Sequence, residues 1–154
     1  MNDLSENSVK AQKALDYFTS GCNCSQSVFA SFHEEMGMTE EDALRLTSSM
    51  GGGIGGLREV CGAVTGMCLA LGALKGYAYP PSHEEKEKHY AFIRRKAAEF
   101  QDVYGTLICR ELLEKYDVKP SPAPAKRTAE YYKTRPCAGF VQACARFVEE
   151  ELNK

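Results

Sequence analysis

Apolar residues along the chain recur three and four positions apart, and runs in which apolar and polar residues alternate are almost absent. Spacing of this kind places apolar side chains on one face of an α-helix, so the sequence predicts an all-α fold of six or seven helices. A further short helical turn is expected at 127–133. The predicted helices span 7–20, 24–36, 40–50, 57–75, 84–104, 106–116 and 137–152.

The predicted helix at 57–75 is unusually rich in small residues, with three glycines and three alanines between positions 62 and 73. A glycine in a helix interior costs about 1 kcal/mol relative to alanine. Such a sequence is therefore expected where neighbouring backbones approach closely. We predict that the other helices pack around this one. The Pro-rich segment 117–126 is too short to mark a domain boundary, so residues 1–154 are interpreted as one helical domain.

The segment GGGIGG at 51–56 contains the pattern G-x-G-x-x-G through Gly51, Gly53 and Gly56. In a dinucleotide site this pattern follows a β-strand and opens a helix whose N-terminus faces the pyrophosphate. The preceding segment, 39–50, has helical spacing and begins with Thr39, a residue suited to N-capping. We therefore expect a flexible turn between two helices, with no bound NAD or ATP.

Composition and charge exclude several classes of protein. The chain has 154 residues, of which 44% are hydrophobic and 26% charged, which is sufficient for a substantial core. A formal net charge of −2 without basic blocks argues against a nucleic-acid partner. The N-terminus is polar, and the longest strongly apolar stretch, 63–74, is too short for membrane insertion. We expect a soluble, cytoplasmic protein and leave its oligomeric state open, a homo-oligomer included.

Cysteine is the unusual feature of the composition. Seven cysteines occur in a chain without tryptophan, at positions 22, 24, 61, 68, 109, 137 and 144. A reducing compartment disfavours lasting disulfides, so this enrichment indicates metal, cluster or redox chemistry. Inert packing is the alternative, because cysteine is also a small hydrophobic residue that is often buried.

Four cysteines fall near the predicted starts of helices: Cys24, Cys61, Cys109 and Cys137. Exposed amides and the helix dipole stabilise a thiolate at such positions, which lowers the thiol pKa and improves a nucleophile or metal ligand. The pairs 61/68 and 137/144 are each separated by about 10 Å along a helix, so neither pair can form a disulfide. Two of the remaining cysteines, at 68 and 144, are expected in the core. Cys22 is left open between a loop thiol and an accessory partner of Cys24.

Four ordered segments resemble the family of redox-active proteins called C_GCAxxG_C_C. They are GCNCSQSV at 21–28, CGAVTG at 61–66 followed by LALG at 69–72, GTLICRELL at 105–113, and the helix that begins at Cys137. The resemblance covers about residues 10–152 and assigns the family's four characteristic cysteines to the same positions, 24, 61, 109 and 137. It implies redox activity without a defined substrate. A related region in certain multihaem cytochromes adds an iron–sulfur cluster as the candidate cofactor, although no haem-binding motif accompanies it here.

Three hypotheses remain open at this point. In the first, Cys24, Cys61, Cys109 and Cys137 converge and act as catalytic thiols or as ligands of an iron–sulfur cluster, in an oxidoreductase or electron-transfer protein with an unidentified redox partner. In the second, the same four cysteines are metal ligands in a zinc-binding or sensing module. The third is a structural helical interaction protein with inert thiols.

Overall fold

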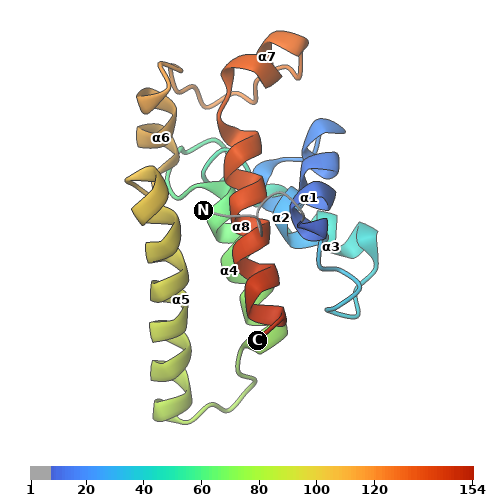
Figure 1. Ribbon diagram of the computed structural model, residues 1–154, viewed down its shortest axis with the longest axis vertical. Coiled ribbons are helices and arrows are strands. Elements are labelled where there is room, and N and C mark those ends of the chain that lie inside the picture. The colour runs from blue at the N-terminus through green and yellow to red at the C-terminus, as the bar shows by residue number, and fades with distance from the viewer. Residues whose placement is uncertain (1–7) are drawn as a thin grey trace.

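The computed structural model describes residues 8–154, and its regular structure in that range is helical (Figure 1). The elements are α1 (Val9–Thr19), α2 (Cys24–Ala30), α3 (Glu40–Leu46), the 3-10 turn η1 (Ser48–Met50), α4 (Gly62–Lys75), α5 (His83–Tyr104), α6 (Cys109–Lys115), α7 (Ala129–Thr134) and α8 (Cys137–Leu152). The all-α prediction is confirmed, as are the helices expected at 84–104 and 137–152. The predicted first helix began at residue 7, which lies outside the described residues.

The predicted start of the central helix at residue 57 is wrong by five residues. Gly52, Gly53, Gly55 and Gly56 all have positive φ, and so does Arg58, which no helix accommodates. The chain then runs extended, and Val60 forms an antiparallel bridge with Ile108. The same bridge delays α6 to Cys109, three residues after its expected start.

Two further predicted helices are shorter than expected. The helix predicted at 24–36 ends at Ala30, and the chain continues in turns to Gly37. Beyond Ala30 the amides of Phe32 and His33 donate to carbonyls three residues back, and the Ser31 hydroxyl donates to the Ser27 carbonyl at 2.7 Å. A hydroxyl that competes for a helix carbonyl weakens the regular ladder. The helix predicted at 40–50 divides at Thr47 into α3 and η1.

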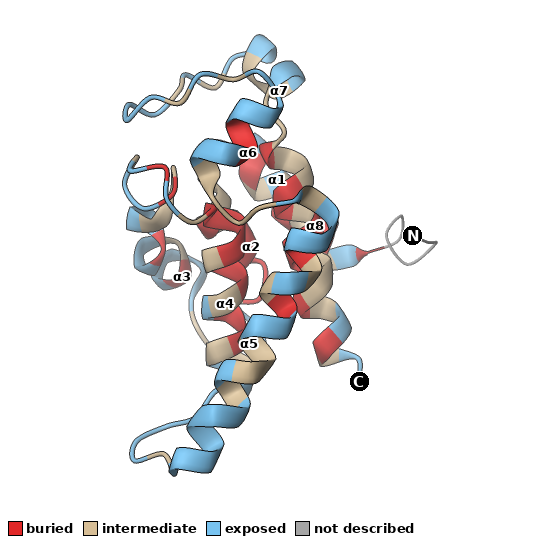
Figure 2. Cartoon of the chain, turned by 90° about the vertical axis from the view of Figure 1, so that its left-hand side faces the viewer, coloured by how far each residue is buried: buried red, intermediate tan, exposed pale blue. Residues whose placement is uncertain are grey.

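The core lies where α4 and α8 run through the middle of the molecule, with α1, α2 and α3 on one side and α5 on the other (Figures 1 and 2). The α2 and α4 backbones approach closely at two glycines. A Cβ added at Gly66 would lie 2.7 Å from the Ser25 carbonyl oxygen, and one at Gly62 would lie 3.1 Å from the Cys24 Cβ. The small residues of α4 therefore serve the close packing that the sequence predicted.

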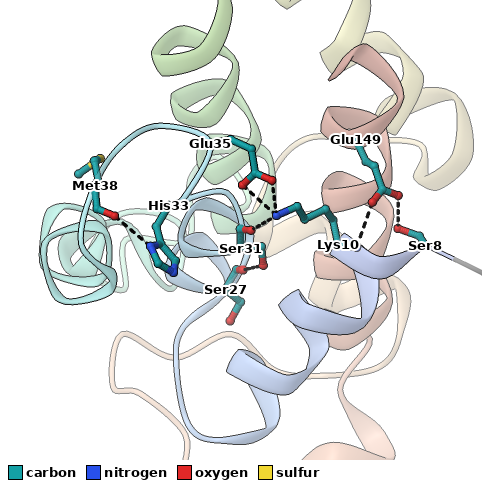
Figure 3. A network of polar contacts seen from close by, with 8 residues as sticks. All are labelled: Ser8, Lys10, Ser27, Ser31, His33, Glu35, Met38 and Glu149. Carbon is teal, nitrogen blue, oxygen red and sulfur yellow. Dashed lines mark hydrogen bonds and ion pairs between the residues drawn. The ribbon is translucent and has the colours of Figure 1, made fainter. Parts of the chain in front are cut away.

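Polar contacts fasten α1 to its neighbours (Figure 3). Ser8 caps α1 by accepting a hydrogen bond from the Ala11 amide, and its hydroxyl donates to Glu149 of α8 at 2.7 Å. Glu149 also accepts a hydrogen bond from the Lys10 amide in the first turn of α1. A carboxylate is stabilised there by the positive end of the helix dipole. The Lys10 ammonium donates to the Ser31 carbonyl and pairs with Glu35 at 2.8 Å. These contacts hold α1 against both α2 and α8.

Two further features complete the fold. α5 is the longest helix, and over most of its length only one side is covered (Figure 2). It ends at Gly105, whose left-handed conformation turns the chain toward the bridge with Val60. Within residues 8–154, no helix combines the length and the apolar character needed to cross a bilayer.

The close approach at Gly66 generates a paired test. Gly66→Ala should lower the free energy of unfolding by about 1–3 kcal/mol, because its Cβ must displace the Ser25 carbonyl or the Val28 side chain. Gly72→Ala is the matched control in the same helix, since nothing lies within 4 Å of a Cβ there. It should stabilise the protein by up to about 1 kcal/mol through helix propensity. Thermal and denaturant unfolding measure both effects, and equal shifts for the two variants would contradict this packing.

Candidate functional site

The four cysteines singled out from the sequence line one cavity of about 340 Å³. Cys24, Cys109 and Cys137 are the first residues of α2, α6 and α8, and Cys61 directly precedes α4. Cys61 was expected inside the first turns of its helix and instead occupies the N-cap position. The cavity therefore lies where the beginnings of four helices meet.

The isolated bridge between Val60 and Ile108 brings two of these cysteines to neighbouring positions. The Cys61 amide donates to the Leu107 carbonyl at 2.8 Å, and the Cys109 amide donates to the Glu59 carbonyl at 2.6 Å. Each cysteine is one residue beyond the paired residue of its own segment. Side chains alternate along extended chain, so Cys61 and Cys109 face the side opposite to Val60 and Ile108.

The glycine-rich loop (residues 51–56) forms one wall of the cavity and packs against the connector between α6 and α7 (residues 117–128). The loop folds back on itself, since the Arg58 amide donates to the Gly52 carbonyl at 2.9 Å. A Cβ at Gly56 would overlap the carbonyl oxygen of Pro122. The glycines thus give the connector a surface to lie on, and a turn of this kind is what the sequence favoured over a nucleotide site.

Arg58 holds the connector against the cavity, and sequence reasoning missed it. Its guanidinium donates to the carbonyls of Ser121 at 2.8 Å and Ala123 at 3.5 Å. A third contact joins Nη1 to the sulfur of Cys109 at 3.7 Å. The available signal was an arginine three residues before Cys61, within the segment that links the glycine-rich loop to α4.

Two more arginines line the cavity from the connector side. Arg127 donates to the carbonyls of Phe18 and Cys22, both at 2.9 Å, and its guanidinium lies 4.4 Å from the centre of the Phe18 ring. Arg135 lies over the Tyr131 ring at 5.0 Å and also interacts with the sulfur of Cys137. Arg58, Arg127 and Arg135 are the charged side chains among the lining residues, which include no Asp, Glu or His. The cavity is therefore cationic in a chain whose net charge is −2.

The four cysteines share the cavity without forming a coordination sphere. Between residues 8 and 154, no group of three or more His, Cys, Asp or Glu side chains is arranged to hold a metal ion. As they lie, the four thiols do not form a set of ligands for a cluster or a zinc ion.

Comparison with known protein families identifies the family of the chain. A family model described as "Putative redox-active protein (C_GCAxxG_C_C)" matches residues 22–151. The chain belongs to this family. No curated protein and no solved structure matches the chain.

Three of the four cavity cysteines of this C_GCAxxG_C_C protein favour the neutral thiol. Burial raises the pKa of Cys61 to about 12, although the amides of Val64 and Ala63 favour its thiolate. Burial also raises the pKa of Cys109 against the opposing charge of Arg58. The pKa of Cys24 is raised by its hydrogen bond with Cys137 and further by burial. The expectation that a helix start lowers the pKa is therefore wrong at these three positions, because desolvation or a neighbouring thiol outweighs it.

Cys137 differs from the other three cysteines. The hydrogen bond with Cys24 lowers the pKa of Cys137 to about 7, and the charges of Arg135 and Arg127 act in the same direction against burial. Its side chain is 8% exposed. The cavity thus holds one thiol that is substantially ionised at neutral pH beside a partner that stays protonated.

The other three cysteines are absent from the cavity lining. Cys144 is fully buried in the core, as predicted, and Cys68 is half-buried against it. Burial raises the pKa of Cys68 to about 11. Cys22 is a half-buried thiol between α1 and α2, and its carbonyl accepts the hydrogen bond from Arg127.

The contact between the glycine-rich loop and the connector can be tested with two alanine variants. Gly55 and Gly56 both have left-handed backbones, so alanine at either position costs about 1–2 kcal/mol of local strain. Only Gly56→Ala also forces the Pro122 carbonyl away. Limited proteolysis with subtilisin should then cut the connector several-fold faster in Gly56→Ala than in Gly55→Ala. Equal cleavage of the two variants would show that the loop does not support the connector.

Proposed function

We propose that the protein is a thiol–disulfide oxidoreductase in which Cys137 is the nucleophile and Cys24 the second thiol of the reacting pair. The observation that carries this proposal is that Cys24 and Cys137 open α2 and α8 at the same cavity, where their interaction raises the pKa of Cys24 and lowers that of Cys137. A thiolate and a neighbouring thiol are the two reactants that disulfide exchange requires. The family's description as redox-active supports the same class of chemistry.

The exchange runs in two steps. The Cys137 thiolate attacks one sulfur of a substrate disulfide, forming a mixed disulfide and releasing the other half as a thiolate. The Cys24 proton passes to this leaving thiolate, and the Cys24 thiolate then attacks the Cys137 sulfur. The second half of the substrate leaves as a thiolate and takes a proton from water. The protein dithiol has lost two electrons and the substrate disulfide has gained them, giving a Cys24–Cys137 disulfide and two substrate thiols.

Cys61 and Cys109 remain proposed members of the same site. Both line the cavity, and both contribute to raising the pKa of Cys24. Their raised pKa values make them poor nucleophiles, so we assign both attacks of the exchange to Cys137 and Cys24. A dithiol reductant regenerates the starting thiols. This cycle needs a reducing compartment, and we place the protein in the cytoplasm on that ground.

The pKa of Cys137 gives a direct test. Reduced, metal-free protein is alkylated with iodoacetamide between pH 5 and 10, and the labelled cysteines are mapped by mass spectrometry. The rate at Cys137 should rise with pH and level off above an inflection at about 7. In Cys24→Ala the inflection should move to higher pH, because the thiolate loses its hydrogen-bond donor. Cys68→Ala, which changes a thiol outside the cavity, should leave the inflection in place. An inflection above 8.5 in the unmodified protein would contradict the assigned nucleophile.

A second experiment traps the intermediate. Reduced Cys24→Ser treated with dithiodiethanol should accumulate one mixed disulfide at Cys137, because the thiol that resolves it has been removed. The parent protein should pass through this adduct to an internal Cys24–Cys137 disulfide, and Cys137→Ser should form neither product. Peptide mapping distinguishes these species. Stable adducts at other cysteines with Cys137 unmodified would reject the proposed roles.

Metal analysis separates this proposal from its alternatives. Anaerobically purified protein is assayed for iron, sulfide and zinc before any chelator is added. We expect less than about one-tenth equivalent of each, and full reactivity of Cys137 without prior metal removal. A stoichiometric cluster or zinc ion that blocks alkylation of Cys24, Cys61, Cys109 and Cys137 would replace thiol exchange with a ligand role.

A further inference from the structure

The charges around the cavity bear on what the site binds. The charged side chains that line it are Arg58, Arg127 and Arg135, and the lining includes no carboxylate. Two of these arginines interact with cavity sulfurs, Arg58 with Cys109 and Arg135 with Cys137. Even with Cys137 ionised, the lining carries about two net positive charges. A partly enclosed cavity concentrates such a field, because its walls exclude the water that would screen it.

The three positive charges are held in place by different means. Arg58 and Arg127 each donate two hydrogen bonds to backbone carbonyls, which fixes their guanidinium groups at the cavity wall. Arg135 instead rests on the face of Tyr131 beside the reacting sulfur. The residue is half-buried. Its backbone amide donates to the Tyr131 carbonyl, but within residues 8–154 its guanidinium donates to no backbone carbonyl. Arg135 can therefore be exchanged without releasing the connector or α1.

The remaining lining limits the size of a ligand. A volume of about 340 Å³ lies at the lower end of the range for small-molecule pockets. Leu112, Leu113 and Phe140 supply apolar walls, and the connector covers one side. A loop of a folded protein carrying a disulfide would have to displace that cover.

From this cationic, covered cavity we propose that the substrate is a small aliphatic disulfide bearing carboxylates, and that Arg135 contributes to its recognition at the reacting sulfur. This inference rests on the proposed thiol–disulfide exchange. One carboxylate disulfide and the Cys24–Cys137 dithiol yield two carboxylate thiols and one protein disulfide, so atoms and electrons balance as in the general scheme. The arginines hold the carboxylates near the cavity wall and stabilise the thiolate that leaves.

Three disulfides of similar size test the charge preference. Dithiodiglycolate is a dianion, dithiodiethanol is neutral and cystamine is a dication at pH 7. The rate of Cys24–Cys137 disulfide formation is measured with each, and divided by the rate of the same disulfide with mercaptoethanol to correct for leaving-group differences. The normalised rate should be about tenfold higher for the dianion than for the neutral compound, lowest for the dication, and the spread should shrink at 1 M salt. Equal normalised rates would overturn the inference and leave the exchange chemistry intact.

Variants of Arg135 separate recognition from activation. Arg135→Gln slows all three reactions by raising the pKa of Cys137, but this effect cancels in the ratio of the dianion rate to the neutral rate at one pH. That ratio should fall about threefold, as expected for loss of one nearby charge in a largely aqueous setting. Arg135→Lys keeps the charge and should retain most of the ratio. An unchanged ratio in Arg135→Gln would show that this arginine only activates the thiol.

Alkylation provides an arm that does not depend on disulfide chemistry. Iodoacetate is an anion and iodoacetamide is its neutral counterpart, so their rate ratio at Cys137, divided by the same ratio for mercaptoethanol, reports the cavity's preference alone. A normalised ratio above one that falls in Arg135→Gln supports the cationic site. If Cys137 prefers iodoacetate but exchanges with none of the disulfides, the exchange chemistry and the assigned substrate are both overturned. The selection of anions by the cavity would still stand.

Discussion

The contact between the α2 and α4 backbones at Gly62 and Gly66 is the constraint on which the rest of the molecule depends. Neither position has room for a Cβ without displacing α2. Cys24 opens α2 and Cys61 directly precedes Gly62, so the same contact that closes the core also sets the separation of two cavity thiols. Packing and chemistry are therefore coupled at one pair of helices, and a change that loosens the core there also alters the site.

Burial decides the character of the individual thiols more strongly than helix position does. All four cavity cysteines lie at or beside a helix start, yet only at Cys137 do the favourable partners outweigh desolvation. Cys61 shows the balance clearly, since it receives favourable backbone amides and still has a pKa raised to about 12. The pKa values of the pair differ because Cys24 acts as the hydrogen-bond donor to Cys137 and because Cys137 has arginines nearby.

Much of the fold could be predicted from sequence because its signals are local. Helical spacing, the cap Thr39 and Gly105 at the end of α5 all act within a few residues. The start of α4 could not be predicted in this way, because the extended stretch around Val60 is fixed by Ile108, far along the chain. The ionisation of the thiols depends on neighbours in space, which spacing along the sequence does not reveal. The role of the arginines could not be predicted for the same reason, since the sequence around Arg127 and Arg135 indicates only a polar connector and a short turn.

Arg58 holds the connector through the main-chain carbonyls of Ser121 and Ala123, and the contact at Gly56 is also to a carbonyl, that of Pro122. A clamp that grips three successive peptide groups is indifferent to the side chains those residues carry. This part of the connector can therefore accept other side chains while keeping its path. Insertion or deletion of a single residue is a different matter, because it would shift every carbonyl out of register with the guanidinium and uncover the thiols.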